Sequence, residues 1–241
     1  MDKKPILELQ GICFSYPGSA PVLRDLALSL YENERIGLIA PNGSGKTTLF
    51  HIIMGLLRPS AGRILAFGRT VSSEKEFIKV RRRVGLLFQD ADDQLFSPTV
   101  LEDVAFGPLN LGKSKKEAVE ISQKTLSFLG LEGFEDRITI KLSGGEKRLV
   151  ALATVLAMKP RVMLLDEPSA GLDEATKHRL VHILKSLDIS YLIVSHEFDF
   201  LSEITDRIYT LQDGRIITDT TPHIHEHVHA HIYGGQPHKH Q

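Results

Sequence analysis

A glycine-rich segment that ends in a lysine and two threonines is the first stretch with evident chemistry. Backbone N–H groups of such a loop can surround a β-phosphate, its lysine can reach the β- and γ-phosphate oxygens, and the first threonine can offer a hydroxyl to Mg²⁺. A short apolar run before the loop and a helical pattern after it provide the expected context. The strict motif begins with glycine, where this chain has Ala40. The predicted nucleotide-binding residues are Asn42, Gly43, Ser44, Gly45, Lys46, Thr47 and Thr48.

Two carboxylates follow an apolar run further along the chain. Asp166 and Glu167 come directly after residues 162–165, and a buried parallel strand delivers its last residues to the ligand-binding edge of its sheet. There Asp166 could hold Mg²⁺ through its water shell, and Glu167 could act on the attacking water as general base or as its orienter. A solvated acidic strand end is the structural alternative. The phosphate loop upstream favours the catalytic interpretation.

A histidine and a glutamine stand at comparable positions. His196 follows the apolar run 191–195, where its imidazole could donate to a γ-phosphate. Gln89 follows the run 84–88, where its amide could ligate Mg²⁺ or bridge to a water. Either residue alone would be an ordinary structural side chain. Together with the phosphate loop and the two carboxylates, they predict one site.

A second potential anion site lies at Ser143-Gly144-Gly145-Glu146, before an apolar helical pattern at 149–158. The start of such a helix would have free N–H groups and the positive end of the helix dipole. One nucleotide does not need two cradles so far apart in the sequence. We therefore expect Ser143, Gly144 and Gly145 to cover the nucleotide that another copy of the chain holds.

Apolar patterns predict the elements that position these residues. Strands are expected at 6–14, 22–30, 35–40, 84–88, 162–165 and 191–194, and helices at 45–56, 74–82, 99–105, 115–129, 149–158, 174–187 and 198–204. This order predicts an α/β P-loop NTPase core with a mainly parallel sheet and N-terminal antiparallel β strands. Strand patterns are absent between 89 and 158, so a helical subdomain is expected at about 90–158. The expected domain covers 1–219, and a flexible tail covers 220–241.

Composition limits the classes of function. The net charge of −1 gives no electrostatic case for nucleic-acid binding. Cys13 is the single cysteine, which excludes an internal disulfide and agrees with a reducing cytoplasm. The longest apolar run, 149–158, is about half of what a membrane span needs, and no signal peptide is visible at the N-terminus. We expect a soluble chain that reaches a membrane only through another protein.

These motifs together resemble the ATPases of ABC transporters, over nearly all of residues 5–219 and in the order of that family. The resemblance implies a head-to-tail dimer with two ATP molecules, each between the phosphate loop of one chain and Ser143, Gly144 and Gly145 of its partner. It also implies that Tyr16 stacks on adenine, that Asp173 couples the two sites, and that every catalytic position is filled. The residues that carry it are Lys46, Thr47, Gln89, Leu142 to Glu146, Asp166, Glu167, Ser169 to Asp173 and His196. Of these, Lys46, Gln89, Glu167 and His196 are the expected catalytic residues, and Thr47, Gln89 and Asp166 the expected Mg²⁺ ligands.

A narrower resemblance lies in the segment 89–108. It is similar to the ATPases of energy-coupling-factor importers. We expect Leu95, Phe96 and Pro98 to form an exposed apolar groove that receives a helix of a membrane subunit, just after Gln89. The alternative is that Leu95 and Phe96 belong to the core of the helical subdomain.

The last residues alternate histidine with other types. Of the chain's 11 histidines, seven lie beyond residue 222, and the expected transition-metal ligands are His223, His225, His227, His229 and His231. Imidazole favours Ni²⁺, Co²⁺, Cu²⁺ and Zn²⁺, and a flexible tail can bring several nitrogens onto one ion. An affinity tag and an incidental low-complexity tail are the alternatives.

Our interpretation is an ATP-hydrolysing subunit of an energy-coupling-factor importer for nickel or cobalt. It would use ATP and Mg²⁺ and work as a homodimer, peripheral on the cytoplasmic face of the cell membrane. Its expected partners are a second ATPase copy, an integral-membrane coupling subunit and a substrate-binding membrane subunit. Three alternatives stay open: a vitamin importer, a soluble ABC ATPase of repair or translation, and a metal-storage or chaperone protein. The sequence does not identify the transported substrate, because substrate selectivity lies in a membrane subunit. It also does not show whether the partner ATPase is an identical copy.

Overall fold

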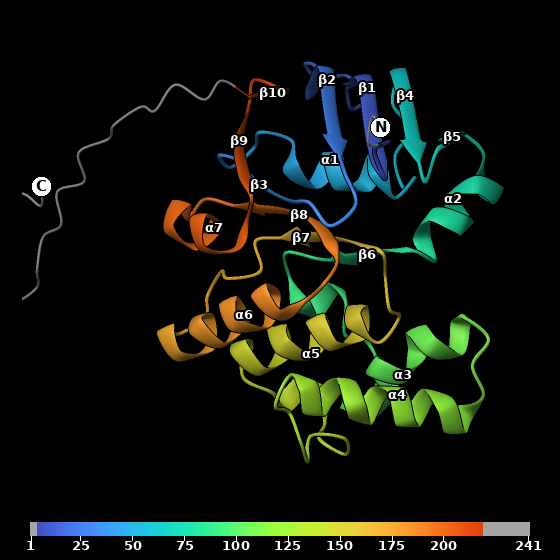
Figure 1. The fold of residues 1–241 in the computed structure, drawn as a ribbon, viewed down its shortest axis with the longest axis vertical. Helices are drawn as coiled ribbons and strands as arrows, with labels where there is room; N and C mark the ends of the chain where they lie inside the picture. The colour runs from blue at the N-terminus through green and yellow to red at the C-terminus, as the bar shows by residue number, and fades with distance from the viewer. Residues whose placement is uncertain (1–3, 219–241) are drawn as a thin grey trace, which may run out of the picture.

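A computed structural model describes residues 4–218, which form two β-sheets and the helices around them (Figure 1). The first sheet is antiparallel and four-stranded, in the order β2-β1-β4-β5. The second is six-stranded, in the order β10-β9-β3-β8-β7-β6, and only β10 runs against its neighbour. The strands are β1 (Leu7–Phe14), β2 (Leu23–Leu30), β3 (Arg35–Ile39), β4 (Ala61–Ala66), β5 (Arg69–Val71), β6 (Val84–Leu87), β7 (Val162–Asp166), β8 (Ser190–Ser195), β9 (Arg207–Gln212) and β10 (Arg215–Ile217).

The helices follow the expected order with shifted ends. Four of them begin with a capping box, in which a serine or threonine and a glutamate three residues later exchange hydrogen bonds with each other's N–H groups. The helices are α1 (Lys46–Ile53), α2 (Glu74–Arg81), α3 (Val100–Asn110), α4 (Lys115–Phe128), α5 (Gly144–Leu156), α6 (Glu174–Ser186) and α7 (Phe198–Ile204), with short 3₁₀ turns at Ala91–Asp93 and Thr139–Lys141. In the described part of the chain, none is long and apolar enough to cross a membrane.

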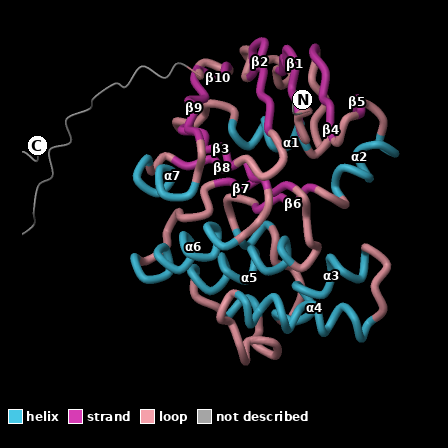
Figure 2. The backbone as a smooth tube through the Cα atoms, viewed as in Figure 1, coloured by secondary structure: helices cyan, strands magenta, loops and turns pink. Residues whose placement is uncertain are grey.

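The parallel strands are buried on both faces because the chain covers each face with a separate core. Along β7, Val162 and Leu164 point into a core shared with α1 and the antiparallel sheet. Met163 and Leu165 point into a core shared with α5, α6 and α7. Figure 2 shows this order of layers, with the parallel strands between the antiparallel sheet and the helices. Such two-sided burial explains the continuous apolar runs in the sequence.

Four strands lie where the sequence predicted none: β4, β5, β9 and β10. These strands are short, and exposed residues interrupt the alternation of apolar and polar side chains that would predict them. In β4, the first three residues are exposed, and only Ile64 and Ala66 are buried. Pairing with β1 places β4 in the antiparallel sheet, and pairing with β3 places β9 in the parallel sheet. These segments therefore form strands because they pair with strands that are far away in the sequence. Helix α5 also begins at Gly144, five residues before the predicted start.

Candidate nucleotide site

Four neighbouring strands deliver the predicted site residues to one edge of the parallel sheet. In register, Ile39 of β3 faces Ser195 of β8, and Asp166 of β7 faces Val194 of β8. Leu87 of β6 faces Leu165 of β7. The residues that follow these strand ends therefore start side by side: the phosphate loop after β3, His196 after β8, Glu167 after β7 and Gln89 shortly after β6. Parallel strands bring their carboxyl ends to the same edge, which is why the sequence could predict this grouping.

The phosphate loop has the backbone that its glycines allow. Gly45 has a φ of +96°, and a Cβ there would lie 2.8 Å from a methyl of Val22, so only glycine fits. The loop leads into α1, whose first N–H groups have no intrahelical acceptors and face the loop. The hydroxyl of Ser44 is buried and has no hydrogen-bond partner among the described residues. A phosphate oxygen would give this hydroxyl the partner that the chain itself does not provide.

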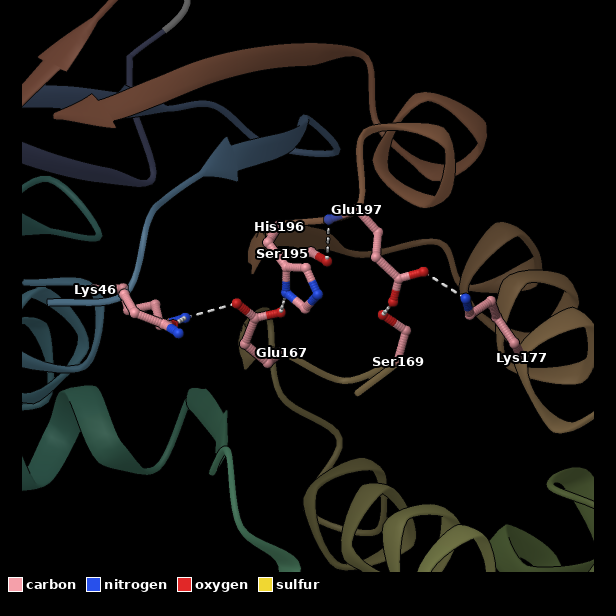
Figure 3. Close-up of polar contacts among 8 residues, drawn as sticks. Lys46, Glu167, Ser169, Lys177, Ser195, His196 and Glu197 are labelled. Atoms are coloured by element: carbon pink, nitrogen blue, oxygen red, sulfur yellow. Dashed lines mark hydrogen bonds and ion pairs between the residues drawn. The ribbon is translucent and has the colours of Figure 1, made fainter. Parts of the chain in front are cut away.

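Lysine, glutamate and histidine meet at the centre of the site. The Lys46 ammonium lies 2.6 Å from one Glu167 carboxylate oxygen. Nδ1 of His196 lies 3.0 Å from the other carboxylate oxygen, as Figure 3 shows. Glu167 is 2% exposed and has a φ of +49°, a conformation that non-glycine residues seldom adopt. The turn after β7 thus holds this carboxylate at a fixed place between Lys46 and His196.

The donor set fits a magnesium ion. The Thr47 hydroxyl donates to one oxygen of Asp166 over 2.9 Å, while the other Asp166 oxygen is buried without a hydrogen-bond partner among residues 4–218. Burial raises the pKa of Asp166, against the opposing hydrogen bond from Thr47 and the charge of Lys46. A buried carboxylate with one free oxygen beside a threonine hydroxyl is suited to a hard divalent cation. We therefore find that Thr47 and Asp166 fit the predicted Mg²⁺.

Two clefts open beside this cluster. The smaller, of about 300 Å³, is lined by Asn42, Lys46, Gln89, Glu167, Ala170 and His196. The larger, of about 710 Å³, is lined by Thr47, His51, Phe88, Gln89, Asp90, Asp93, Arg148, Ala170 and Gly171. Gln89 borders both clefts, and both lie against the phosphate loop. The structure therefore brings Gln89 together with the other predicted site residues.

Tyr16, which the family resemblance predicts to stack on adenine, lies next to the phosphate loop. Its hydroxyl is 3.1 Å from the Thr48 hydroxyl, and its ring stands edge-on to Phe14 with the centroids 4.9 Å apart. The Tyr16 side chain is 42% exposed. Its stacking on adenine, which the family resemblance implies, stays a prediction.

The segment Ser143-Gly144-Gly145 borders neither cleft. It forms the N-terminus of α5, where Ser143 and Glu146 make a capping box: the Ser143 hydroxyl accepts from the Glu146 N–H, and the Glu146 carboxylate accepts from the Ser143 N–H. The backbone hydrogen bond from Ser143 lowers the pKa of Glu146. The expectation of entirely bare N–H groups was therefore wrong at these two residues. The N–H groups of Gly144 and Gly145 still have no acceptor within the helix.

Sequence reasoning missed a buried arginine on α5. Arg148 is 8% exposed and donates to the Phe88 carbonyl over 3.0 Å. Burial lowers its pKa, and the nearby carboxylates of Asp90, Asp166 and Glu167 act against this shift. Its position directly before the apolar run 149–158 was the signal, because an arginine buried at the end of such a run needs anionic or carbonyl partners. The sequence also gave no reason to single out Lys177 or Glu197.

The segment after Gln89 divides into a buried part and an exposed part. Leu95 is 9% exposed and belongs to the helical core, so its predicted exposure was wrong. Phe96 is 67% exposed and packs edge-on against Phe106, with the centroids 4.8 Å apart. Pro98 is exposed as well. The Leu95 side chain points into the core because Gln94 anchors the preceding 3₁₀ turn. The side-chain oxygen of Gln94 accepts from the Phe88 N–H, and its side-chain nitrogen donates to the Ala151 carbonyl and the Thr154 hydroxyl.

The predicted metal ligands His223, His225, His227, His229 and His231 lie outside the described residues. Within residues 4–218, no group of three or more His, Cys, Asp or Glu side chains is arranged to hold a metal ion.

Comparison with known proteins shows the family to which this chain belongs. The sequence model of the ABC transporter family matches residues 23–170. The chain is 44% identical over 221 residues to "Energy-coupling factor transporter ATP-binding protein EcfA" of Methanothermobacter thermautotrophicus, covering 90% of this chain and 71% of that protein. It is 42% identical over 219 residues to "Cobalt import ATP-binding protein CbiO" of Rhodobacter capsulatus, covering 89% of this chain and 78% of that protein.

A solved structure has the same fold. The protein is cbiO1 from Clostridium perfringens, described as part of the ABC transporter complex cbiONQ. It superposes with a TM-score of 0.80 at 34% identity, and the match covers 89% of this chain and 88% of that one. The predicted P-loop NTPase fold is thereby confirmed. With the family match over more than half of its length and the nucleotide site assembled at the sheet edge, the chain belongs to the ABC transporter family as an ATP-binding ATPase subunit.

Proposed function

We propose that this chain hydrolyses ATP in a dimer and uses dimer closure to drive an energy-coupling-factor importer of nickel or cobalt ions. The observation that carries the proposal is the division of the site. Lys46, Asp166, Glu167 and His196 converge at one sheet edge, whereas Ser143, Gly144 and Gly145 border neither cleft there. A second copy can supply the missing side of the site.

Hydrolysis begins with a rearrangement of the central ion pair. The Glu167 carboxylate pairs with the Lys46 ammonium. When ATP enters, the Lys46 ammonium would move to the β- and γ-phosphate oxygens, and the Glu167 carboxylate would be released toward the attacking water. Water oxygen then bonds the γ-phosphorus as the bond to the bridging oxygen breaks, and Glu167 accepts the water proton. ADP and phosphate leave.

The other residues position the reacting groups. His196 would donate to the γ-phosphate from the place where it now contacts Glu167, and Gln89 would orient water from the border of both clefts. Thr47 and Asp166, with Gln89, would hold Mg²⁺, which supplies positive charge against the phosphate oxygens when bound. The partner's Ser143, with the N–H groups of Gly144 and Gly145, would close over the γ-phosphate.

The test of the ATPase assignment is Glu167→Gln, a change that keeps the shape of the side chain and removes its basicity. Hydrolysis should fall by about 100-fold or more, while ATP binding is kept, so that an ATP-bound dimer accumulates in size-exclusion chromatography. Arg161, which pairs with the exposed Glu32 away from the site, provides a control in Arg161→Met with unchanged turnover. Full turnover by the Glu167→Gln variant would exclude the assigned role of Glu167.

A membrane partner is proposed from the exposed aromatic pair. Phe96 and Phe106 are 67% and 47% exposed and contact each other, and they follow Gln89 closely in the sequence. An apolar helix of a membrane coupling subunit could bind there and follow the movement of the segment when the dimer closes. The chain would then be peripheral, on the cytoplasmic face of the membrane, with a substrate-binding membrane subunit as the third component.

The choice of nickel or cobalt is supported by the cobalt-import relative and by the histidine-rich sequence after residue 222. The vitamin importer remains the second candidate, because the energy-coupling-factor relative has a name without a substrate. Detergent extraction of the tagged protein followed by mass spectrometry of the bound subunits tests both. Recovery of soluble partners alone would contradict the importer. Equal Ni²⁺ titrations of the full-length chain and a 1–219 variant would remove the support from the tail.

A further inference from the structure

Glu197 stands next to His196 but points away from the nucleotide cluster (Figure 3). One of its carboxylate oxygens accepts from the Ser169 hydroxyl over 2.9 Å. The other forms an ion pair with Lys177 on α6. Ser169 is 1% exposed and follows Glu167 by two residues. Glu197 therefore ties the loop of His196 both to the segment after Glu167 and to the first turn of α6.

The ion pair is partly shielded from solvent. The side chains of Lys177 and Glu197 are 23% and 27% exposed, in contrast to most of the ion pairs on the surface of the molecule. Burial alone would raise the pKa of Glu197, but the hydrogen bonds from Lys177 and Ser169 outweigh it and lower that pKa. The hydrogen bond to Glu197 in turn raises the pKa of Lys177. The pair is charged at neutral pH and has a defined geometry.

The first turn of α6 reaches the start of α5. Thr176, which precedes Lys177, is held by the Asp173 carboxylate through its N–H and its hydroxyl, at 2.9 Å each. A Cβ on Gly145 would lie 3.6 Å from the Thr176 methyl and 3.7 Å from Leu172. Gly145 therefore lies close to the turn that Lys177 anchors. His196, Glu197, the first turn of α6 and the Ser143-Gly144-Gly145 segment thus follow one another within the same chain.

We propose that Glu197 is a positioning residue that couples the two ATP sites through one chain, by linking His196 to the Ser143-Gly144-Gly145 segment. The inference rests on the proposed dimer. There, His196 serves the ATP bound by its own chain, and Gly145 serves the ATP of the partner. A displacement of His196 when its γ-phosphate binds or leaves would move Glu197, Lys177 and the first turn of α6, and so shift the segment that covers the other nucleotide.

The experiment compares two ion pairs that link α6 to the chain around α7. Glu197→Gln keeps the acceptor for Ser169 and removes the charge, and Lys177→Met removes the partner. The matched control is Lys185→Met with Glu203→Gln, an exposed pair that also joins α6 to α7, at 3.3 Å. Steady-state ATP hydrolysis of the full chain gives kcat, KM and the Hill coefficient for each variant, and thermal unfolding gives the Tm.

We expect Glu197→Gln and Lys177→Met each to bring the Hill coefficient to about 1 and to lower kcat by about 3- to 30-fold, with KM within about twofold of the parent. The double variant should be no worse than either single one, because both remove the same link. The control should match the parent. Lys177→Met, whose side chain is partly exposed, keeps the test valid should Glu197→Gln fold poorly.

The inference is overturned when Glu197→Gln behaves like the Lys185/Glu203 control. It is also overturned when the parent protein hydrolyses ATP with a Hill coefficient of 1, since no coupling then exists to be transmitted. Loss of activity that tracks a lower Tm, with kcat and KM changed together, would assign Glu197 a purely structural role. If the proposed function itself is wrong, a different result is expected: the parent chain will neither hydrolyse ATP nor form a dimer in the presence of ATP.

Discussion

The Glu167 carboxylate illustrates how one residue can be placed by its partners before the reaction begins. Its two oxygens contact Lys46 and His196, so the side chain is already held at the site where the γ-phosphate and water would meet. One of these contacts pairs the Lys46 ammonium with the Glu167 carboxylate. In the proposed reaction, the phosphates of ATP would take the place of this carboxylate at Lys46 and leave the base free for the water.

Burial disfavours the charged form of the Asp166 carboxylate, and this leads to a prediction. Burial raises its pKa above the ordinary 3.8. Its contribution therefore becomes destabilising as the pH rises from about 3.8 through the folded-state pKa, and stays so above it. Asp166→Asn should stabilise the nucleotide-free protein at pH 8 by about 1 kcal/mol and abolish Mg²⁺-dependent hydrolysis. Thermal unfolding measured from pH 8 downward should show the gain shrinking as the pH falls through the folded-state pKa of Asp166 toward 3.8.

Asp173 supplies a control of opposite sign. Hydrogen bonding from the Thr176 backbone lowers the pKa of Asp173, so its stabilising contribution is present above its ordinary pKa and is lost as the pH falls. Asp173→Asn should lower the Tm at pH 8. A drop in Tm for Asp166→Asn at that pH would contradict the interpretation of Asp166 as a strained metal ligand.

At the scale of elements, close packing between α1 and α2 depends on one glycine. Gly55 follows α1 with a φ of +71°, and a Cβ there would lie 2.3 Å from the ring of Phe77 on α2. Phe77 is 5% exposed and belongs to the core below the antiparallel sheet. This contact fixes the position of α2 relative to the C-terminal end of α1, which is the helix that follows the phosphate loop.

Gly55→Ala should therefore destabilise the fold by about 3 kcal/mol, through left-handed strain together with the clash at Phe77. Gly68→Ala is the matched control, because Gly68 has a φ of +76° but no heavy atom within 4 Å of an added Cβ; it should cost only about 1 kcal/mol. Urea unfolding measures both. Equal losses for the two variants would show that the Phe77 contact is not responsible.

At the scale of the whole molecule, the proposed dimer lets one chain contribute residues to two nucleotide sites. Ser143 borders neither of the two clefts that open beside Lys46 and Thr47. In a head-to-tail dimer with two-fold symmetry, each nucleotide would contact Lys46 of one subunit and Ser143 of the other. Neither residue then needs to approach the other within a chain. In that dimer, the N–H groups of Gly144 and Gly145, which have no acceptor within the helix, would face the partner's nucleotide.

Complementation between two inactive variants tests this arrangement. Lys46→Ala and Ser143→Arg should each be inactive as homodimers. In a mixed dimer, one site combines both changes and the other has neither, so random mixing should restore about a quarter of the parent activity if the sites are independent, and less than that if they are coupled. Phosphate release from co-expressed variants measures it. A site built within one chain would give no recovery, because every chain would carry a damaged site.

The local sequence by itself determined most of the nucleotide site. Glycines at positive φ, a lysine after them, and polar residues directly after apolar runs are properties of short segments. Because the carboxyl ends of parallel strands share one edge, these segments predict a common site without any knowledge of long-range contacts. The same reasoning predicted the helices and the strands buried on both faces, whose patterns are strong and continuous.

The tertiary structure decided what depends on contacts between distant segments. β4 and β9 become strands through pairing with β1 and β3, and Leu95 is buried because Gln94 anchors its turn to α5. The ties of Glu197 to Ser169 and Lys177 span 28 and 20 residues, and no local pattern indicates them. Side-chain partners are set by packing in three dimensions, whereas strand ends and glycine turns are set by the backbone of each segment itself.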